Sequence, residues 1–556
     1  MPFSIFQRPQ IVSKLQSEKF DVLIIGGGIT GAGIALDAAS RGLKVALVEK
    51  NDFAFGTSSR STKLIHGGLR YLKQLEFGLV KEVGSERAVV HSLAPHLVVP
   101  EKMLLPLSEK RGMGYWLTSI GLKMYDLLAG VKSEDQRRML TKIQTLKYEP
   151  LLRRDDVKGG AIYAEYRTDD ARLTIEIIKT AVQHGATILS YTRATDFIYD
   201  NEVISGINVD DQLTGESFKI QSTVVVNAAG PWVDELREVN KSKQGKSLHL
   251  TKGVHVVVAH ERFPVKQAIY FNVDDGRMIF AIPRGRCTYI GTTDTSYIGN
   301  KDEVFTSRED AYYLITAVNS NFPSVHLKLE DLESSWAGLR PLIHEEGKSA
   351  SELSRKDEIF ESSSGLISIA GGKLTGYRKM AERVVDLVIE KHFEGKRFMP
   401  CMTHKIKLTL SDFVDFVAVK RYLVVVRKRL LQLGLPEAKA KYLVENFGRQ
   451  TDQILDSLES NFDNNAPELS LLKAELDFCL QSEMVCSLQD FLVRRTGLMY
   501  FDIRMVKEHK QAIAEEMKSK LGWSDEKLVK EWDEINSLMV SITQFSIRSE
   551  SFLNGH

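Results

Sequence analysis

Residues 20–31 read FDVLIIGGGITG, a short apolar run that ends directly in closely spaced glycines. Such a run with branched residues is typical of a strand buried on both faces of a parallel sheet. Small or apolar residues then recur at helical spacing, and residues 43–48 (LKVALV) read as the next strand. The stretch therefore predicts one strand–helix–strand unit of a Rossmann-like, nucleotide-binding domain.

The glycines of this turn each meet a different requirement of dinucleotide binding. Gly26 permits the tight turn, Gly28 lets the backbone approach a pyrophosphate, and Gly31 lets the helix pack closely on the strand. The helix start, where Thr30 lies, favours phosphates through its unpaired N–H groups and its dipole. Glu49 follows about 20 residues later, where a carboxylate accepts hydrogen bonds from an adenosine ribose. The same carboxylate would repel a 2′-phosphate, which argues against NADP.

Length and composition indicate an ordered protein of several domains. The 556 residues exceed the size of one hydrophobic core, which predicts roughly two or three domains. The formal net charge of +1 gives no reason to expect nucleic acid as a partner. Four cysteines without a CxxC pair indicate neither a disulfide framework nor a thiolate metal site, and they fit a reducing cytoplasm. No secretory signal is evident and no apolar run approaches the ~20 residues that span a bilayer, so any membrane attachment is expected to be peripheral or monotopic.

Later segments fit a longer cofactor than NAD. Residues 51–72 (NDFAFGTSSRSTKLIHGGLRYL) are rich in small hydroxyl residues and glycine, which a simple NAD domain does not need. Residues 223–230 (TVVVNAAG) and 367–373 (ISIAGGK) are further apolar strands that run into small residues. Both are expected to return to the nucleotide domain, an arrangement that favours FAD.

Together with AGGKLTGYRK at residues 370–379, these segments resemble the FAD-dependent glycerol-3-phosphate dehydrogenases of the D-amino-acid-oxidase-like superfamily. The resemblance keeps the same order over roughly the first 400 residues, and the remainder is similar to the helical C-terminal domain of that family. SSRSTKLIHGGLRYL is the most specific piece, because neither flavin binding in general nor core packing demands it. The related glycerophosphate oxidases carry an additional insertion that is not evident here, so the resemblance favours a membrane quinone over oxygen as electron acceptor.

The resemblance implies FAD contacts beyond the glycine turn and Glu49. The further cofactor-binding residues that it implies are Thr57, Ser58, Ser59, Lys63, Leu64, His66, Gly67, Ala194, Gly230, Gly372, Lys373, Leu374 and Thr375. No cysteine lies near these segments, and a histidyl link through His66 has only proximity in its favour. The cofactor is therefore expected to be noncovalent FAD.

Four further runs are predicted to form an antiparallel sheet over the flavin ring: HLTKGVHVVVA, AIYFNV, MIFAIPRG and CTYIGTTD. A phosphorylated alcohol needs cations for its phosphate and a base for its hydroxyl proton. By resemblance, Arg340 binds the phosphate, Arg355 is a second clamp, and Arg70 and Tyr71 lie over the ring. The alternative for a bare arginine is a surface ion pair.

Two more residues receive catalytic roles. His255 matches a histidine that lines the family's active site, and imidazole suits a base near neutral pH. Its alternatives are a structural histidine or one that orients the substrate hydroxyl. Lys373 precedes a helical pattern that begins at Thr375, and helix-start N–H groups with a nearby cation stabilise charge developing on a flavin. The alternative for Lys373 is a lysine that faces solvent.

The predicted fold class is α/β, with a Rossmann-like FAD-binding domain, an antiparallel-sheet substrate domain and a C-terminal helical domain. The FAD-binding domain is assigned to residues 1–95, 160–235 and 345–398, the substrate region to residues 96–159 and 236–344, and the helical domain to residues 399–556. The helical domain is interpreted as a support for the base of the enzyme or as an oligomer contact, such as that of a homodimer.

Two amphipathic segments are candidates for contact with an anionic membrane at the inner, cytoplasmic face. Residues 114–129 (GYWLTSIGLKMYDLLA) place apolar side chains on one helical face. Residues 419–435 (VKRYLVVVRKRLLQLGL) combine basic and aliphatic side chains. Each is also typical of a core-facing helix with a solvated basic side.

The resemblance implies oxidation of sn-glycerol 3-phosphate to dihydroxyacetone phosphate, with hydride passing to FAD and electrons to quinone. The nearest alternative is an oxidase that uses oxygen and makes peroxide. More distant alternatives are an amine or amino-acid oxidase and a flavin-binding sensor without turnover.

Overall fold

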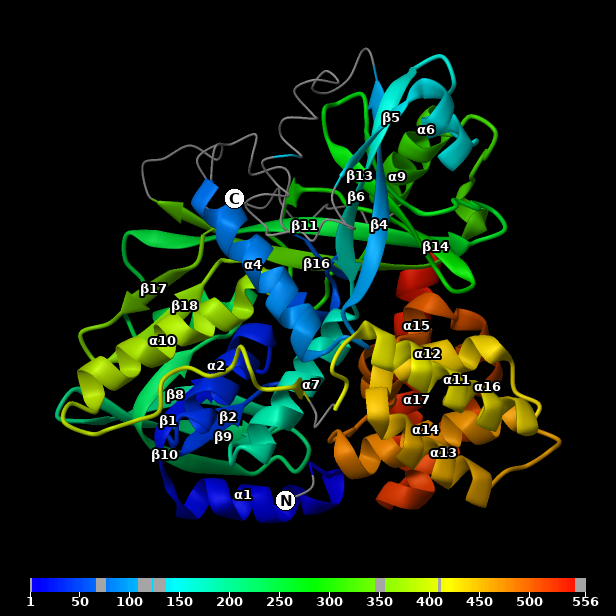
Figure 1. The fold of residues 1–556 in the computed structure, drawn as a ribbon. Coiled ribbons are helices and arrows are strands. Elements are labelled where there is room, and N and C mark those ends of the chain that lie inside the picture. The colour runs from blue at the N-terminus through cyan, green and yellow to red at the C-terminus, as the bar shows by residue number, and fades with distance from the viewer. Residues whose placement is uncertain are drawn as a thin grey trace, which may run out of the picture.

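The computed structural model describes residues 3–66, 77–108, 123, 137–345, 356–408 and 412–545. These residues form two sheets and a helical C-terminal region (Figure 1). The α/β class with a Rossmann-like part, a mainly antiparallel sheet and a helical C-terminus is thereby confirmed. The predicted membrane segment at residues 114–129 lies outside the described residues except for Lys123.

The first sheet carries the glycine-rich turn. Its order is β17 (Glu358–Glu361), β18 (Leu366–Ala370), β10 (Ser217–Asn227), β1 (Lys19–Ile25), β2 (Val45–Val48) and β7 (Thr187–Leu189). All neighbours in this order are parallel except β17 with β18. The hairpin of β8 (Thr192–Asp200) and β9 (Val203–Asp211) joins this sheet through β9, which pairs antiparallel with residues 217–221 at the start of β10. The expected strands around the glycines and at residues 223–230 and 367–373 are therefore present as β1, β2, β10 and β18.

Helices cover this sheet, and small residues in α2 allow the neighbouring helices to pack closely against it. Helix α2 (Ile29–Ser40) joins β1 to β2 and is buried almost all round, as a helix between other elements must be. It packs against α7 (Asp170–Gln183) and α10 (Tyr377–His392). Gly33 makes the second contact possible, because a Cβ there would lie 2.8 Å from the Tyr377 ring.

The second sheet contains the four strands expected from sequence. Its order is β15 (Thr295–Ser296), β11 (Lys246–Ala259), β14 (Cys287–Gly291), β13 (Met278–Arg284), β12 (Ala268–Asn272), β4 (Val99–Ser108), β6 (Val157–Arg167) and β3 (Leu64–Ile65). Strand β16 (Leu332–Glu345) pairs with β11 along nearly its whole length, and β5 (Arg138–Thr141) pairs with β6. Every pair is antiparallel except β12 with β4. Strand β6 runs across residue 160, where a domain boundary is predicted.

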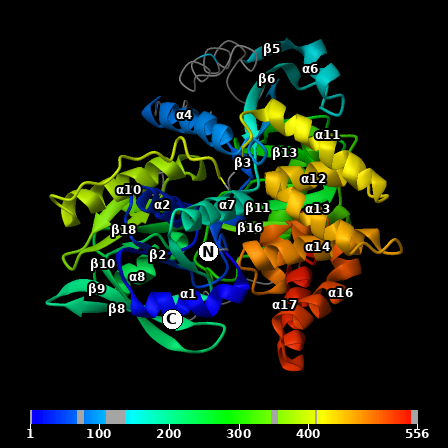
Figure 2. The ribbon, with the colours of Figure 1, turned by 60° about the horizontal axis from the view of Figure 1, so that its bottom comes forward.

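The helical region begins at α11 (Phe416–Gln432) and ends at α17 (Asp525–Thr543). Between them lie α12 (Glu437–Phe447), α13 (Thr451–Ser460), α14 (Pro467–Ser482), the π-helix η10 (Asp490–Arg495), α15 (Leu498–Phe501) and α16 (Ile503–Leu521). These helices lie together beside the rest of the molecule, in yellow to red (Figures 1 and 2). One apolar cluster continues from the second sheet into them, where Trp336 lies 5.3 Å from the Tyr500 ring. In the part of the chain that the structure describes, no helix combines the length and apolarity needed to cross a bilayer.

Candidate active site

A cavity of about 330 Å³ lies where the carboxyl ends of β1, β2 and β18 approach the second sheet. Open α/β sheets bind ligands at this edge, outside the carboxyl ends of their strands. The cavity brings together most of the predicted cofactor residues, which are Gly26, Gly28, Thr30, Glu49, Thr57, Ser58, Ala194, Gly230, Gly372, Lys373 and Leu374. Segments that are far apart in sequence therefore converge on one site.

Two glycines of the turn are required by the backbone geometry. Gly26 has a φ of +115°, and a Cβ there would lie 2.6 Å from the Ala228 carbonyl oxygen. Gly31 does not line the cavity, because it faces the strand: a Cβ there would lie 1.9 Å from the Gly26 carbonyl oxygen. Gly28 is the N-cap of α2 and supplies no side chain to cover the helix start. The N–H groups of that start are thus turned toward the cavity, where they favour an anion.

Glu49 is held at the cavity by the backbone around it. Its Oε2 accepts a hydrogen bond from the Gly27 N–H at 2.7 Å, and its Oε1 accepts one from the Asn51 N–H at 2.9 Å. Burial raises the pKa of Glu49, although these two N–H groups oppose the shift. The two bonds fix the direction of the carboxylate and leave further lone pairs for a ribose.

The segment that follows bridges the two sheets. Ser58 Oγ accepts from the Ile29 N–H at 2.9 Å and so satisfies a donor at the start of α2. Thr57 Oγ1 donates to the Leu339 carbonyl of β16 at 2.6 Å. Residues 57–58 thereby join the helix that faces the phosphates to the sheet that carries the predicted substrate groups.

Some predicted cofactor residues support the cavity without lining it, namely Ser59, Lys63, Leu64, His66 and Thr375. The Lys63 ammonium is buried, 2.5 Å from Asp170 Oδ1 and 3.2 Å from the Ser59 carbonyl. Burial would lower the pKa of Lys63, but Asp169 and Asp170 outweigh it and raise the pKa. Burial and Lys373 hold the pKa of His66 well below 6.5, so this ring is neutral at pH 7. The predicted residues Gly67, Arg70, Tyr71 and Arg355 lie outside the described residues.

His255 occupies the sheet end of the site. It lies on β11, is 1% exposed, and stacks on Trp336 with ring centroids 4.8 Å apart and planes at 11°. Its Nε2 lies 3.0 Å from Thr62 Oγ1, whereas its buried Nδ1 has no hydrogen-bond partner among the described residues. Burial, with the charges of Arg340 and Lys63, holds the pKa of His255 well below 6.5. A neutral imidazole is therefore present at pH 7 and can accept a proton.

Arg340 shares the face of the sheet that carries His255. On the β11–β16 ladder, Arg340 lies opposite Thr251 and Trp336 lies opposite His255. Because the two pairs are four residues apart on each strand, all four side chains point to the same face of the sheet. Its guanidinium donates to Thr292 Oγ1 at 2.8 Å and to the Thr293 carbonyl at 3.1 Å. The guanidinium also forms an ion pair with Asp294 Oδ1 at 3.3 Å, and the side chain is 31% exposed.

Two glycines make room for this pair of side chains. A Cβ at Gly253 would lie 2.2 Å from a guanidinium nitrogen of Arg340. A Cβ at Gly291 would lie 2.1 Å from His255 Cδ2. The strands β11 and β14 thus provide the space in which a cation and a neutral imidazole lie close together.

Three threonines at this end were not among the predicted site residues. Thr62 contacts His255, and Thr292 and Thr293 hold Arg340. Thr62 belongs to the most specific segment of the sequence, and the other two end the strand CTYIGTTD. In the sequence, only their position within or beside a predicted catalytic segment indicates that these threonines belong to the site. A threonine by itself does not indicate a functional role.

The residues present fit FAD. The start of α2, where Gly28 supplies no capping side chain, suits a pyrophosphate, and Glu49 suits a ribose hydroxyl. The cavity continues to Lys373 and Pro341 near the second sheet. A Rossmann-like edge whose cavity continues to a second, mainly antiparallel sheet fits a flavin-dependent oxidoreductase. The chain belongs to this class: residues 21–378 match the family model described as FAD dependent oxidoreductase.

The comparisons with individual proteins narrow the family. Residues 401–528 match the C-terminal domain of alpha-glycerophosphate oxidase. The aerobic glycerol-3-phosphate dehydrogenase of Staphylococcus aureus (strain MRSA252) is 50% identical over 531 residues, which cover 94% of this chain and 95% of that one. The glycerol-3-phosphate dehydrogenase from Bacillus halodurans complexed with FAD has 42% identity and a TM-score of 0.84, over 99% of this chain and 100% of that one. The chain belongs to the aerobic glycerol-3-phosphate dehydrogenase family, and its cofactor is FAD.

A more distant structure shares the fold alone. The L-alpha-glycerophosphate oxidase from Mycoplasma pneumoniae with FAD bound is 21% identical with a TM-score of 0.55, over 69% of this chain and 96% of that one.

Proposed function

We propose that this protein oxidises sn-glycerol 3-phosphate to dihydroxyacetone phosphate. The observation that carries the proposal is the placement of Arg340 and His255 on one face of the second sheet, near enough for the Arg340 charge to lower the pKa of His255. Neither side chain lines the FAD cavity itself, but Pro341, the next residue after Arg340, and Ser61, the residue before Thr62, both do. A guanidinium binds a phosphate through charge-assisted hydrogen bonds, and a neutral imidazole takes a proton from a hydroxyl. The name shared by the relatives supports this substrate.

FAD, Arg340 and His255 have separate roles in this reaction. FAD bound in this cavity supplies the hydride acceptor. Arg340 holds the phosphate, and its bonds to Thr292 and Thr293 fix its orientation. His255 removes the hydroxyl proton, and the contact of its Nε2 with Thr62 Oγ1 at 3.0 Å orients the ring. The hydroxyl carbon thus loses a hydride and its oxygen loses a proton, which leaves the ketone.

Lys373 is a cation in the cavity that would stabilise negative charge on a reduced flavin. It lines the cavity between Gly372 and Leu374, just before α10, and its charge reaches His66. We propose that the ammonium and the N–H groups of this helix start favour flavin reduction. We also propose that FAD is noncovalent, so flavin should separate from the polypeptide on denaturation.

One anaerobic spectrum tests the substrate. Adding glycerol 3-phosphate to the holoenzyme should bleach the flavin absorbance, whereas glycerol and simple amino acids should not. Bleaching by an amino acid alone would assign the site to an amino-acid oxidase, and no bleaching by any substrate would favour a flavin-binding sensor.

We infer that electrons pass to a membrane quinone and that α11 places the enzyme on the cytoplasmic face of the membrane. No acidic residue occurs in α11, whose buried side carries Val419, Tyr422, Val426 and Leu430. Its opposite side exposes aliphatic residues at or just before the helix, which are Val414, Val417, Val424, Val425 and Leu431. Lys420, Arg421 and Lys428 are exposed among them. An apolar surface on a helix that carries cations and no carboxylate beyond its N-cap Asp415 fits an anionic lipid interface.

Vesicle binding and acceptor assays test this inference. The enzyme should sediment with vesicles that contain phosphatidylglycerol, and Val424→Asp with Val425→Asp should abolish binding. The matched control is Val529→Asp, an exposed valine on α17. Retained vesicle binding, with self-association lost instead, would identify the face as a homodimer contact. Peroxide formed in place of reduced soluble quinone would identify an oxidase.

A further inference from the structure

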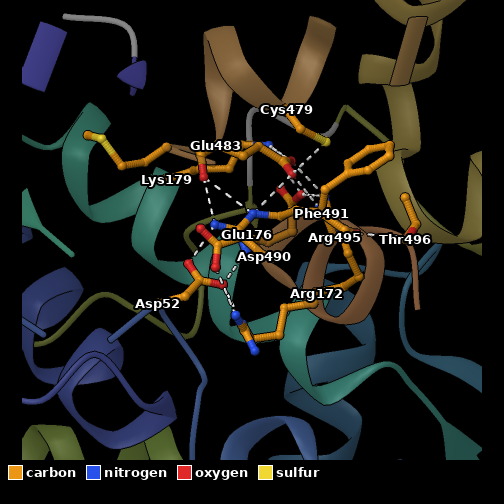
Figure 3. A network of polar contacts seen from close by, with 12 residues as sticks. Asp52, Arg172, Glu176, Lys179, Cys479, Glu483, Asp490, Phe491, Arg495 and Thr496 are labelled. Carbon is orange, nitrogen blue, oxygen red and sulfur yellow. Dashed lines mark hydrogen bonds and ion pairs between the residues drawn. The ribbon is translucent and has the colours of Figure 1, made fainter. Parts of the chain in front are cut away.

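A buried polar network joins the helical region to the nucleotide-binding sheet (Figure 3). Its charged members are each at most 5% exposed, and they are Asp52, Arg172, Glu176, Lys179, Glu483, Asp490, Arg494 and Arg495. Half of them come from the sheet and from α7, and half from the helical region. Charges buried this deeply persist only where they are paired, so the network fixes how the two parts meet.

The first link reaches the loop that follows β2. Asp52 accepts hydrogen bonds from Arg495 Nη1 at 2.7 Å and Nη2 at 2.8 Å, and also from Arg494 Nε. Burial would raise the pKa of Asp52, but the two guanidiniums outweigh it and hold the pKa below its usual value. The same loop supplies Glu49, Lys50 and Phe55 to the FAD cavity.

The second link reaches the loop that follows β7. Tyr191 has a φ of +54° and donates from its hydroxyl to Asp490 Oδ1 at 2.6 Å. The next residues, 192–195, line the FAD cavity. The two loops also bond to each other, because the Thr192 N–H donates to the Glu49 carbonyl at 2.7 Å.

Both links end on one turn of the helical region. Asp490, Arg494 and Arg495 belong to the π-helix η10, a conformation that often occurs at functional sites. Arg494 Nη2 donates to Asp490 Oδ1 at 2.8 Å and so joins the two links. Asp490 is itself fixed by the N–H groups of Cys486 and Ser487, at 2.8 and 3.0 Å. A rigid turn therefore holds two cavity loops from behind.

We propose that Asp490, Arg494 and Arg495 are positioning residues for FAD. None of them lines the cavity, and they act through Asp52 and Tyr191 on the loops that meet the adenosine half of the cofactor. The helical region thus contributes to cofactor affinity without touching the cofactor. The proposal rests on FAD as the cofactor but not on the identity of the substrate. The positioning role can therefore be disproved while the proposed function holds, and the proposed function can be disproved while the positioning role holds.

The chain offers a matched pair of substitutions. Tyr191→Phe removes the hydroxyl that bonds Asp490. Tyr442→Phe removes a hydroxyl that donates to Glu475 Oε2 at 2.7 Å, inside the helical region and away from the cavity. Each tyrosine is partly exposed, and burial raises the pKa of each well above 10, so the two changes are chemically alike.

The quantity to measure is the Kd of FAD, obtained from the fluorescence of the flavin that dissociates when the holoenzyme is diluted. Urea unfolding in saturating FAD checks that stability is unchanged. We expect Tyr191→Phe to raise the Kd about tenfold, the effect of one hydrogen bond to a charged group, and Tyr442→Phe to change it less than about twofold. Equal Kd values for both variants would overturn the proposal. If Tyr191→Phe does not fold, Arg494→Lys tests the same turn, because it keeps the charge and loses the fork that joins Asp52 to Asp490; an unchanged Kd there overturns the proposal as well.

Discussion

Charged and polar side chains gather both at the substrate end of the cavity and at the interface around η10. The two regions differ in how completely these side chains are paired with one another. At the interface, Asp52 and Arg495 are 0% exposed and satisfy each other. At the substrate end, Arg340 is 31% exposed beside Asp294, and His255 keeps a ring nitrogen without a partner among the described residues. Mutual satisfaction stabilises a fold, whereas remaining hydrogen-bonding capacity is what a ligand uses. Substitutions should therefore separate stability from catalysis according to region.

The largest effect is expected at the interface. Arg495→Met should lower the free energy of unfolding by about 3–5 kcal/mol, because it leaves Asp52 buried with one guanidinium fewer. Urea unfolding in saturating FAD measures this. Arg504→Met is the control, since its ion pair with Asp502 is 3.5 Å long and the arginine is 66% exposed. Equal losses in both variants would remove the distinction between the regions.

The next effect should appear in catalysis alone. Arg340→Ala should lower kcat/KM for glycerol 3-phosphate roughly 100-fold, or ~2.7 kcal/mol, through loss of charge-assisted bonds to phosphate. The free energy of unfolding should change by less than about 1 kcal/mol, because the guanidinium is partly solvated. Steady-state kinetics and urea unfolding measure the two quantities, with Arg277→Ala as a control at an exposed ion pair. An unchanged kcat/KM would contradict the assigned phosphate role.

A buried histidine that packs against Phe413 and Gly448 should make stability depend on pH. Burial lowers the pKa of His96 to about 3, and both of its ring nitrogens lack partners among the described residues. Because the folded pKa lies below the unfolded value of about 6.5, the unfolded chain takes up the proton first, and stability falls as pH drops from about 6.5 to about 3. By pH 5 the loss should be about 2 kcal/mol.

His96→Leu tests this contribution. It should flatten the fall in the free energy of unfolding between pH 7 and pH 5, whereas the exposed His184→Gln should leave the slope unchanged. An identical slope in wild type and His96→Leu would show that other groups cause the dependence.

The smallest effect is expected from the hydroxyl beside His255. Thr62→Val should lower kcat about tenfold, because the imidazole loses the bond that orients Nε2. Thr62→Ser should restore it, since serine keeps the hydroxyl. The KM for glycerol 3-phosphate should stay within about twofold in both variants, because Arg340 carries the phosphate. A fall in kcat that serine does not rescue would assign Thr62 to packing.

The nucleotide-binding edge was predictable because its requirements are local. Gly26 and Gly31 are needed by backbone geometry within one turn, and the apolar runs beside them have the length of buried strands. The strands of the second sheet were also readable as short apolar runs. What a local pattern does not contain is their pairing, and the alignment of Arg340 with Thr251 joins strands almost ninety residues apart.

The partners of buried charges were beyond sequence reasoning for the same reason. Lys63 belongs to a segment that resembles a cofactor-binding motif, yet its ammonium meets Asp170, 107 residues away. Neither residue shows in isolation that it is buried, because lysine and aspartate are usually exposed. The helical region gave no catalytic signal either, and its contact with the cavity loops appears only when β2 and η10 are placed together.

Asp52 and Arg495 are 443 residues apart in the chain, so the bond between them forms only after nearly the whole protein has been synthesised. At typical elongation rates a ribosome needs roughly 20–90 s to make that length of chain. The last strand of the nucleotide-binding sheet, β18, is made late in this interval, and the cations that hold the Asp52 loop follow later still. On our proposal, a chain that ended between β18 and η10 would contain every strand of this sheet and yet bind flavin more weakly than the full chain.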